Sequence, residues 1–308
     1  VISHTYPYLE TDMDRGKELA KKYPNILTKV KQLFFHKIAG FALTQSSPII
    51  IYAYTTLTIV ALYGNYMLIV MGVQTLMTAM FNSMNAGIGN LVAEGDKRKI
   101  VSVFAELFSI RFLFSCIMCF GVLLVTPSFV SFWIGKEYVM DSLSLLLMTA
   151  ILFINLSRTT VDTYINAYGL FSDIWAPVIE ASVNVGLSII LGYSFGLHGV
   201  LSGVLISLFL VVFCWKPCYL FRKGLDEPLR IYVFMYAKHL VVTLLCGVIV
   251  FLGMRYSMEK ENTTFFAGLL TTLVFSVLDT LALLFVAQGM RNLMMRFVRM
   301  CHLTIIDG

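Results

Sequence analysis

Eight apolar stretches, each about 19 to 29 residues long, follow one another between Ile38 and Gln288 with only short polar segments between them. A bilayer core of about 30 Å needs about 20 apolar residues in a helix, and because it holds no water, helices are the spanning structure that fits this pattern. We therefore predict an all-α, polytopic membrane protein with about eight transmembrane helices. The expected spans are 36–56, 62–90, 100–126, 141–168, 175–195, 197–221, 232–254 and 263–288.

The composition supports this prediction, because 58% of the residues are hydrophobic and only 13% are charged. A lipid environment solvates such a surface, whereas a water-soluble globule with it would precipitate. Most of the six cysteines lie within apolar runs and have no histidine or acidic residue close by in the sequence. We interpret them as small core residues and expect neither a zinc site nor a redox role.

The lysines and arginines predict the orientation of the spans. One side of the predicted membrane has only Lys136, Arg255 and Lys260. The other side carries Arg15, Lys17, Lys21, Lys22, Lys29, Lys31, Lys37, Lys97, Arg98, Lys99, Lys216, Arg222, Lys223, Arg230, Arg291, Arg296 and Arg299. By the positive-inside rule this excess marks the cytoplasm, so both ends of the chain are expected there.

Three regions are expected along the chain. Residues 1–35 contain apolar positions at helical spacing with lysines between them, which predicts an amphipathic helix either on the cytoplasmic leaflet or packed against the bundle as a linker. Residues 36–288 form the eight-helix bundle, and residues 289–308 form a basic cytoplasmic tail. Because the chain begins at Val1 with a charged segment, we also expect it to be an internal part of a longer protein.

Catalysis is not expected. The sequence contains no HExxH motif, no phosphate-binding GxxxxGK(S/T) loop and no recognisable Ser/His/Asp set, and large extramembrane loops are absent. A transporter fits better, since it needs only polar residues inside the membrane and helices that move.

A polar stripe runs along the fourth expected span. Asn155, Arg158, Asp162 and Asn166 fall at i, i+3, i+7 and i+11, on one helix face. A charge at the bilayer centre costs at least about 2.5 kcal/mol, so this face must meet protein or water. Two interpretations stay open: a wet cavity in which Arg158 attracts an anionic substrate, or an ion pair that tethers neighbouring helices.

Two further sets of polar residues point to the same region. Glu180 and Asn184 lie one turn apart in the fifth span, where they either share a cavity with the first stripe or form interhelical hydrogen bonds. Arg111 lies in the third span without an acid at i±3 or i±4. It therefore requires an acid from another helix, such as Asp162 or Asp279, or an anionic ligand.

Two other segments suggest local structure. Gln45 and Ser46 precede Pro48 in the first span, where a proline kink either exposes carbonyls to a pathway or is only structural. The glycines between the fifth and sixth spans predict a closely packed helical hairpin. They are Gly192, Gly196, Gly199 and Gly203.

Several segments resemble the polysaccharide flippases, of the O-antigen and capsule type, in the multidrug/oligosaccharidyl-lipid/polysaccharide exporter superfamily. They are FHKIAGFALTQSSPIIIYAYTTLTIVALYGNYMLIV from Phe35, GIGNLVAEGD from Gly87, FWIGKEYV from Phe132 and INAYGLFSDIWAPVIEASVNVGLSIILGYSFGLHGVLSG from Ile165. The resemblance implies that the spans correspond to helices 7 to 14 of a two-lobed flippase, preceded by the inter-lobe linker. The first lobe would be missing from this chain.

The resemblance also implies a function: moving a polyprenyl-diphosphate-linked oligosaccharide across a bacterial inner membrane by alternating access, without a cofactor. The implied partners are the lipid-linked oligosaccharide, membrane lipids, the missing N-terminal lobe and a polysaccharide polymerase, and no nucleic acid. Relatives line the cavity with basic residues, for which Arg111 and Arg158 are the candidates here. Where relatives often carry an acid in helix seven, this chain has Gln45 and Ser46, which weakens any carboxylate-based proton or sodium coupling at that position.

Two rival functions are kept. A drug or metabolite antiporter of the same superfamily would use Asp162, Glu180 or Asp279 as its proton or sodium site. A non-transporting membrane scaffold would bind polymerisation partners and would tolerate the loss of Arg158.

Overall fold

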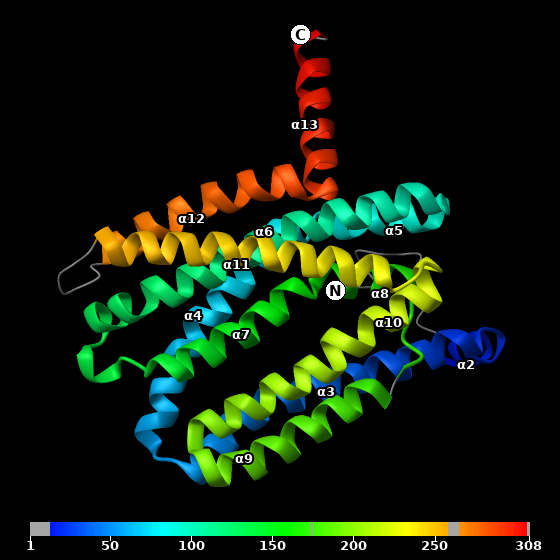
Figure 1. The fold of residues 1–308 in the computed structure, drawn as a ribbon. Helices are drawn as coiled ribbons and strands as arrows, with labels where there is room; N and C mark the ends of the chain where they lie inside the picture. The colour runs from blue at the N-terminus through cyan, green and yellow to red at the C-terminus, as the bar shows by residue number, and fades with distance from the viewer. Residues whose placement is uncertain (1–12, 174, 258–264, 307–308) are drawn as a thin grey trace, which may run out of the picture.

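The computed structural model describes residues 13–173, 175–257 and 265–306, and every regular element in these ranges is helical, as predicted (Figure 1). The elements are α2 (Met13–Lys22), α3 (Pro24–Tyr54), α4 (Leu57–Phe81), α5 (Met84–Glu94), α6 (Lys97–Trp133), η1 (Lys136–Tyr138), α7 (Ser142–Ser157), α8 (Thr159–Tyr168), α9 (Trp175–Ser207), η2 (Leu208–Trp215), α10 (Lys216–Leu220), η3 (Phe221–Leu225), α11 (Arg230–Ser257), α12 (Phe265–Val286) and α13 (Gln288–Ile306).

Six helical stretches within these residues are long and apolar enough to cross a membrane. They are Leu57–Phe81, Lys97–Trp133, Ser142–Tyr168, Trp175–Leu225, Arg230–Met254 and Phe265–Val286. This agrees with a polytopic helical membrane protein, whereas the count of eight stays a prediction. The difference arises because α3, which contains the expected first span, is not among the six, and because the fifth and sixth expected spans form one continuous helical stretch.

That continuous stretch folds back on itself as the predicted hairpin. Gly196 has a left-handed backbone with φ of 56°, which reverses the chain without the steric cost that a side chain would add. A Cβ at Gly199 would clash with the carbonyl of Leu191, and a Cβ at Gly203 would lie 2.6 Å from the amide nitrogen of Ser188. The two arms therefore approach at backbone contact distance, as small residues permit.

Two other expected spans are each divided into two helices. The expected span 62–90 is two helices, α4 and α5, separated at Asn82 and Ser83. The expected span 141–168 is interrupted at Arg158, between α7 and α8.

At the N-terminal side, Pro24 occupies the first turn of α3, where its missing N–H costs nothing. The amphipathic segment before residue 36 and the expected first span consequently form one helix, which also contains Pro48.

The interior consists of two large apolar clusters. One brings α3, α4 and α7 against the hairpin around Ile51, Leu152 and Val200. The other is aromatic and joins α6, α8 and α11, with Phe104 lying 5.1 Å from Tyr164 between ring centroids. Edge-to-face contacts of this kind stabilise beyond simple burial.

Apolar side chains also cover the outside of the bundle. On α12, for example, Phe266 is 78% exposed and Phe285 is 81% exposed. A bilayer solvates such groups at no cost, whereas water would not. At its end α12 passes into α13, which runs across the direction of the neighbouring helices (Figure 1).

Candidate functional site

A cavity of about 540 Å³ lies inside the bundle, bounded by residues of α3, α4, α6, α7, α8 and the α9 hairpin. Seven of the nine residues predicted from the sequence line it. They are Arg111, Asn155, Arg158, Asp162, Asn166, Glu180 and Asn184. Ser46 is not among its lining residues, although its neighbour Ser47 is. The side chain of Gln45 lies outside the described part of the structure.

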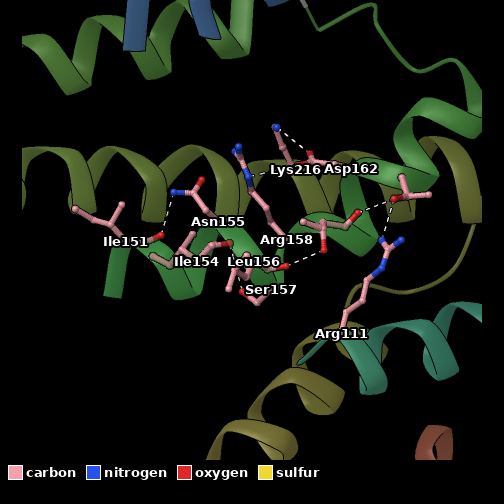
Figure 2. A network of polar contacts seen from close by, with 11 residues as sticks. Arg111, Ile151, Ile154, Asn155, Leu156, Ser157, Arg158, Asp162 and Lys216 are labelled. Carbon is pink, nitrogen blue, oxygen red and sulfur yellow. Dashed lines mark hydrogen bonds and ion pairs between the residues drawn. The ribbon is translucent and has the colours of Figure 1, made fainter. Parts of the chain in front are cut away.

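The centre of the polar wall is a carboxylate held by two cations. Arg158 Nε lies 3.4 Å from one oxygen of Asp162, and Lys216 Nζ lies 2.9 Å from the other (Figure 2). Arg158 and Asp162 are one helical turn apart, as their spacing predicts. The predicted ion pair is therefore present and faces the cavity, whereas the attraction of an anionic substrate by Arg158 stays a prediction.

Lys216 was missed as a site residue. The sequence places it at the end of an apolar run, where it is expected to lie in the cytoplasmic interface. In the structure, η2 continues the second hairpin arm to Trp215, and α10 begins at Lys216 beside Asp162. The only sequence signal is a lysine immediately after a long apolar segment, which does not identify its partner.

Arg111 reaches the same cavity from α6 and is 2% exposed. Its Nη1 donates a hydrogen bond of 2.9 Å to Thr163 Oγ1 (Figure 2). Its guanidinium carbon lies 5.2 Å from the ring centroid of Phe81. Its Nε has no hydrogen-bond partner. Of the two expected partners, an acid forms no ion pair with Arg111 among the described residues, where Arg111 contacts a hydroxyl and an aromatic face. The other, an anionic ligand, stays a prediction.

Asp279 lies elsewhere in the bundle. Its carboxylate is fully buried and accepts hydrogen bonds from Thr243 Oγ1 at 2.9 and 3.2 Å, which join α12 to α11. Because Asp279 does not line the cavity, it belongs to the packing of these two helices.

The α9 stripe divides between the cavity and the hairpin. Glu180 is 5% exposed and lines the cavity, and no ion pair or hydrogen bond reaches its side chain from the described residues. Asn184 donates a hydrogen bond of 3.1 Å to Ser207 Oγ, while its Oδ1 is buried without a partner. Ser188 turns away and donates to the carbonyl of Val200 inside the hairpin. Only the first two positions are thus available to a ligand.

Asn155 and Asn166 complete the polar wall. The Nδ2 of Asn155 donates a hydrogen bond of 3.0 Å to the carbonyl of Ile151, its own preceding turn, so its Oδ1 stays free to face the cavity (Figure 2). Asn166 is exposed and lies at the far end of the stripe.

Another part of the cavity lining is rich in methionine. Met67, Met71 and Met77 contribute from α4, and Met148 contributes from α7. Unbranched, polarizable side chains of this kind adapt to irregular apolar groups. The cavity therefore has a charged wall and an adaptable apolar wall, which suits an amphipathic molecule with an anionic part. Among the described residues, no group of three His, Cys, Asp or Glu side chains could hold a metal ion.

Comparison with known proteins gives no family assignment. No family model, no curated protein and no solved structure matches the chain. The resemblance to polysaccharide flippases consequently stays a prediction, and the case for a function rests on the cavity.

Proposed function

We propose that this chain forms part of a membrane transporter that moves an anionic lipid-linked oligosaccharide, a polyprenyl diphosphate carrying sugars, across a membrane by alternating access. The observation that carries the proposal is Arg111, a buried guanidinium in a membrane cavity. Among the described residues its Nε has no hydrogen-bond partner and its Nη1 donates to a neutral hydroxyl. A diphosphate would supply the missing acceptor, since guanidinium binds phosphate oxygens through two parallel hydrogen bonds.

The charges around the cavity favour an anion. Arg111, Arg158 and Lys216 supply three cations against the carboxylates of Asp162 and Glu180. Asp162 is already paired with two of the cations, whereas Arg111 has no ion pair among the described residues and can bind a ligand. A charge in such a low-dielectric site needs a partner, and a substrate diphosphate provides it.

Binding of a defined probe tests this proposal. The purified protein in nanodiscs is titrated with a polyprenyl diphosphate and, separately, with the uncharged polyprenol of the same length. We expect saturable binding of the diphosphate only, weakened at least tenfold by Arg111→Gln. The matched control is Lys99→Gln, which removes a cation that pairs with Glu94 outside the cavity. Equal binding of both lipids, or unchanged binding by Arg111→Gln, would contradict the proposal.

A second candidate rests on a different residue. Glu180 is a buried carboxylate in the same cavity without a described cation partner, which is an arrangement that takes up a proton or a metal cation. This favours a cation-coupled antiporter of drugs or metabolites. Transport of a cationic dye driven by a proton or sodium gradient in proteoliposomes would support this candidate over the first.

A further inference from the structure

The side chains of α13 separate into two faces. At 3.6 residues per turn, Met290, Leu293, Met294 and Phe297 share one face. The opposite face carries Arg291, Asn292, Arg296 and Arg299, with Met295 as its one apolar side chain among residues 290–299. This segregation of apolar and basic groups is typical of helices that lie in the plane of a membrane surface.

Contacts at the start of α13 fix the direction of each face. Met290 is buried against Leu113 of α6 and Leu283 of α12, which both belong to apolar spans. On the other face, the Nε of Arg296 lies 3.2 Å from a carboxylate oxygen of Glu106, two turns nearer the start of α6 than Leu113. The apolar face of α13 therefore points toward the interior of the spans, and the basic face points toward their ends.

Beyond the bundle the apolar face has no protein cover in the described structure. Met294 is 47% exposed and Phe297 is 64% exposed, and both continue the stripe that begins at Met290. Figure 1 shows α13 extending away from α12 and α6, with no other helix beside its outer part. The adjacent turn of α12 is also apolar and exposed at Phe285. The stripe is thus continuous with the lipid-facing surface of the bundle.

The basic face has the charge that an anionic surface would match. The segment 288–306 contains no Asp or Glu, and of its arginines only Arg296 has an ion pair within the described residues. Arg291 and Arg299 are exposed on a helix that begins where the apolar span Phe265–Val286 ends. Phospholipid phosphates lie where such a span ends, and one basic side chain near an anionic leaflet strengthens attachment about fivefold.

We propose that α13 lies in the surface of the bilayer, with Met294 and Phe297 among the acyl chains and with Arg291 and Arg299 bound to the headgroups of anionic phospholipids. The ion pair between Arg296 and Glu106 fixes the rotation of α13 about its own axis. In this orientation the apolar face meets the acyl chains and the basic face meets the headgroups. This inference is independent of any transported substrate, since it concerns a helix outside the cavity.

Two matched tryptophan variants test the orientation. The full chain carrying Phe297→Trp or Asn292→Trp is reconstituted into vesicles of phosphatidylcholine with phosphatidylglycerol, with bromine on the acyl chains, and the emission of the parent protein is subtracted. We expect strong quenching for Phe297→Trp and little for Asn292→Trp. Equal quenching of the two, or none at residue 297, would overturn the proposal.

A second experiment varies the charge of the lipid. In vesicles of phosphatidylcholine alone, quenching of Phe297→Trp should fall, and Arg291→Gln with Arg299→Gln should abolish the difference between the two vesicle types. Each single substitution should lower the preference for phosphatidylglycerol about fivefold. No dependence on lipid charge would contradict the role of the arginines.

Amide hydrogen exchange of the unmodified protein tests the same proposal without any substitution, so it still applies if a variant fails to fold. We expect the amides of α13 to be protected more in the anionic vesicles than in phosphatidylcholine. Protection that follows protein concentration instead of lipid charge would identify a second copy as the cover of the apolar face, and it would overturn the lipid assignment.

Discussion

Lys216 places its Nζ 2.9 Å from Oδ1 of Asp162, although 54 positions separate the two residues in the chain. The contact ties the end of the hairpin to α8, and Arg158 holds the other oxygen of the same carboxylate. Removing one member of such a partly buried group leaves its partners short of a counter-charge. The polar wall of the cavity therefore depends on a contact between distant segments.

We expect Lys216→Met to destabilise the fold by about 1–3 kcal/mol, because it leaves Asp162 with a single cation in a partly buried site. The measurement is the unfolding midpoint in detergent. Asp162→Asn with Lys216→Met should cost less than the sum of the two single changes. The control Lys97→Met, which breaks an exposed pair with Asp226, should leave the midpoint unchanged.

The hairpin should be intolerant of any added side chain at its closest approach. Gly199→Ala places a Cβ against the carbonyl of Leu191, so the arms must separate and the unfolding midpoint should drop clearly. Gly186→Ala in the same helix adds a methyl group with nothing within 4 Å, and it should be neutral or slightly stabilising. Similar behaviour of the two variants would contradict the close packing described here.

Glu180→Gln distinguishes the two proposed functions. Because no described cation pairs with Glu180, its replacement leaves no charge stranded, and folding stability should be kept. Gradient-driven transport of a cationic dye should disappear in this variant if the protein is an antiporter. Binding of a polyprenyl diphosphate, by contrast, should persist or strengthen, since a negative charge leaves the cavity.

Acid should loosen the contact between α7 and the turn of the hairpin. Partial burial alone would raise the pKa of the Asp141 carboxyl, but hydrogen bonds from His198 and from the Ser144 amide lower it to about 2. A lowered pKa gives stability above the ordinary value near 4 that is lost as pH falls toward 2. The unfolding midpoint of the wild type should therefore fall over this window, and Asp141→Asn should flatten the profile.

Much of the candidate site followed from helical periodicity. The spacing of Asn155, Arg158 and Asp162 requires one helix face, and the cost of charge in lipid requires that this face meet protein or water. The glycines around Gly196 likewise predicted the hairpin, because small residues permit backbone contact.

Contacts between distant segments could not be predicted in the same way. The pairing of Lys216 with Asp162 depends on how the second hairpin arm continues through η2, and hydropathy does not encode that path. The protein contacts of Arg111 could not be predicted for a similar reason. Charge arguments favoured an acid or an anionic ligand, whereas packing supplied Thr163 and the ring of Phe81. The break between α4 and α5 falls at Asn82 and Ser83, a short polar signal that the long apolar segments on either side outweighed.

The central proposal is that Arg111 receives the diphosphate of a lipid-linked oligosaccharide. The most direct test is restoration of surface polysaccharide in a flippase-null bacterial cell by the gene encoding this chain at its full natural length, with Arg111→Ala and Lys99→Ala compared at equal protein levels. The proposal predicts that the unmodified gene and Lys99→Ala restore the polymer and that Arg111→Ala does not. Restoration by Arg111→Ala, or failure of the unmodified gene with several sugar-lipid donors while it protects cells from cationic drugs, would contradict it.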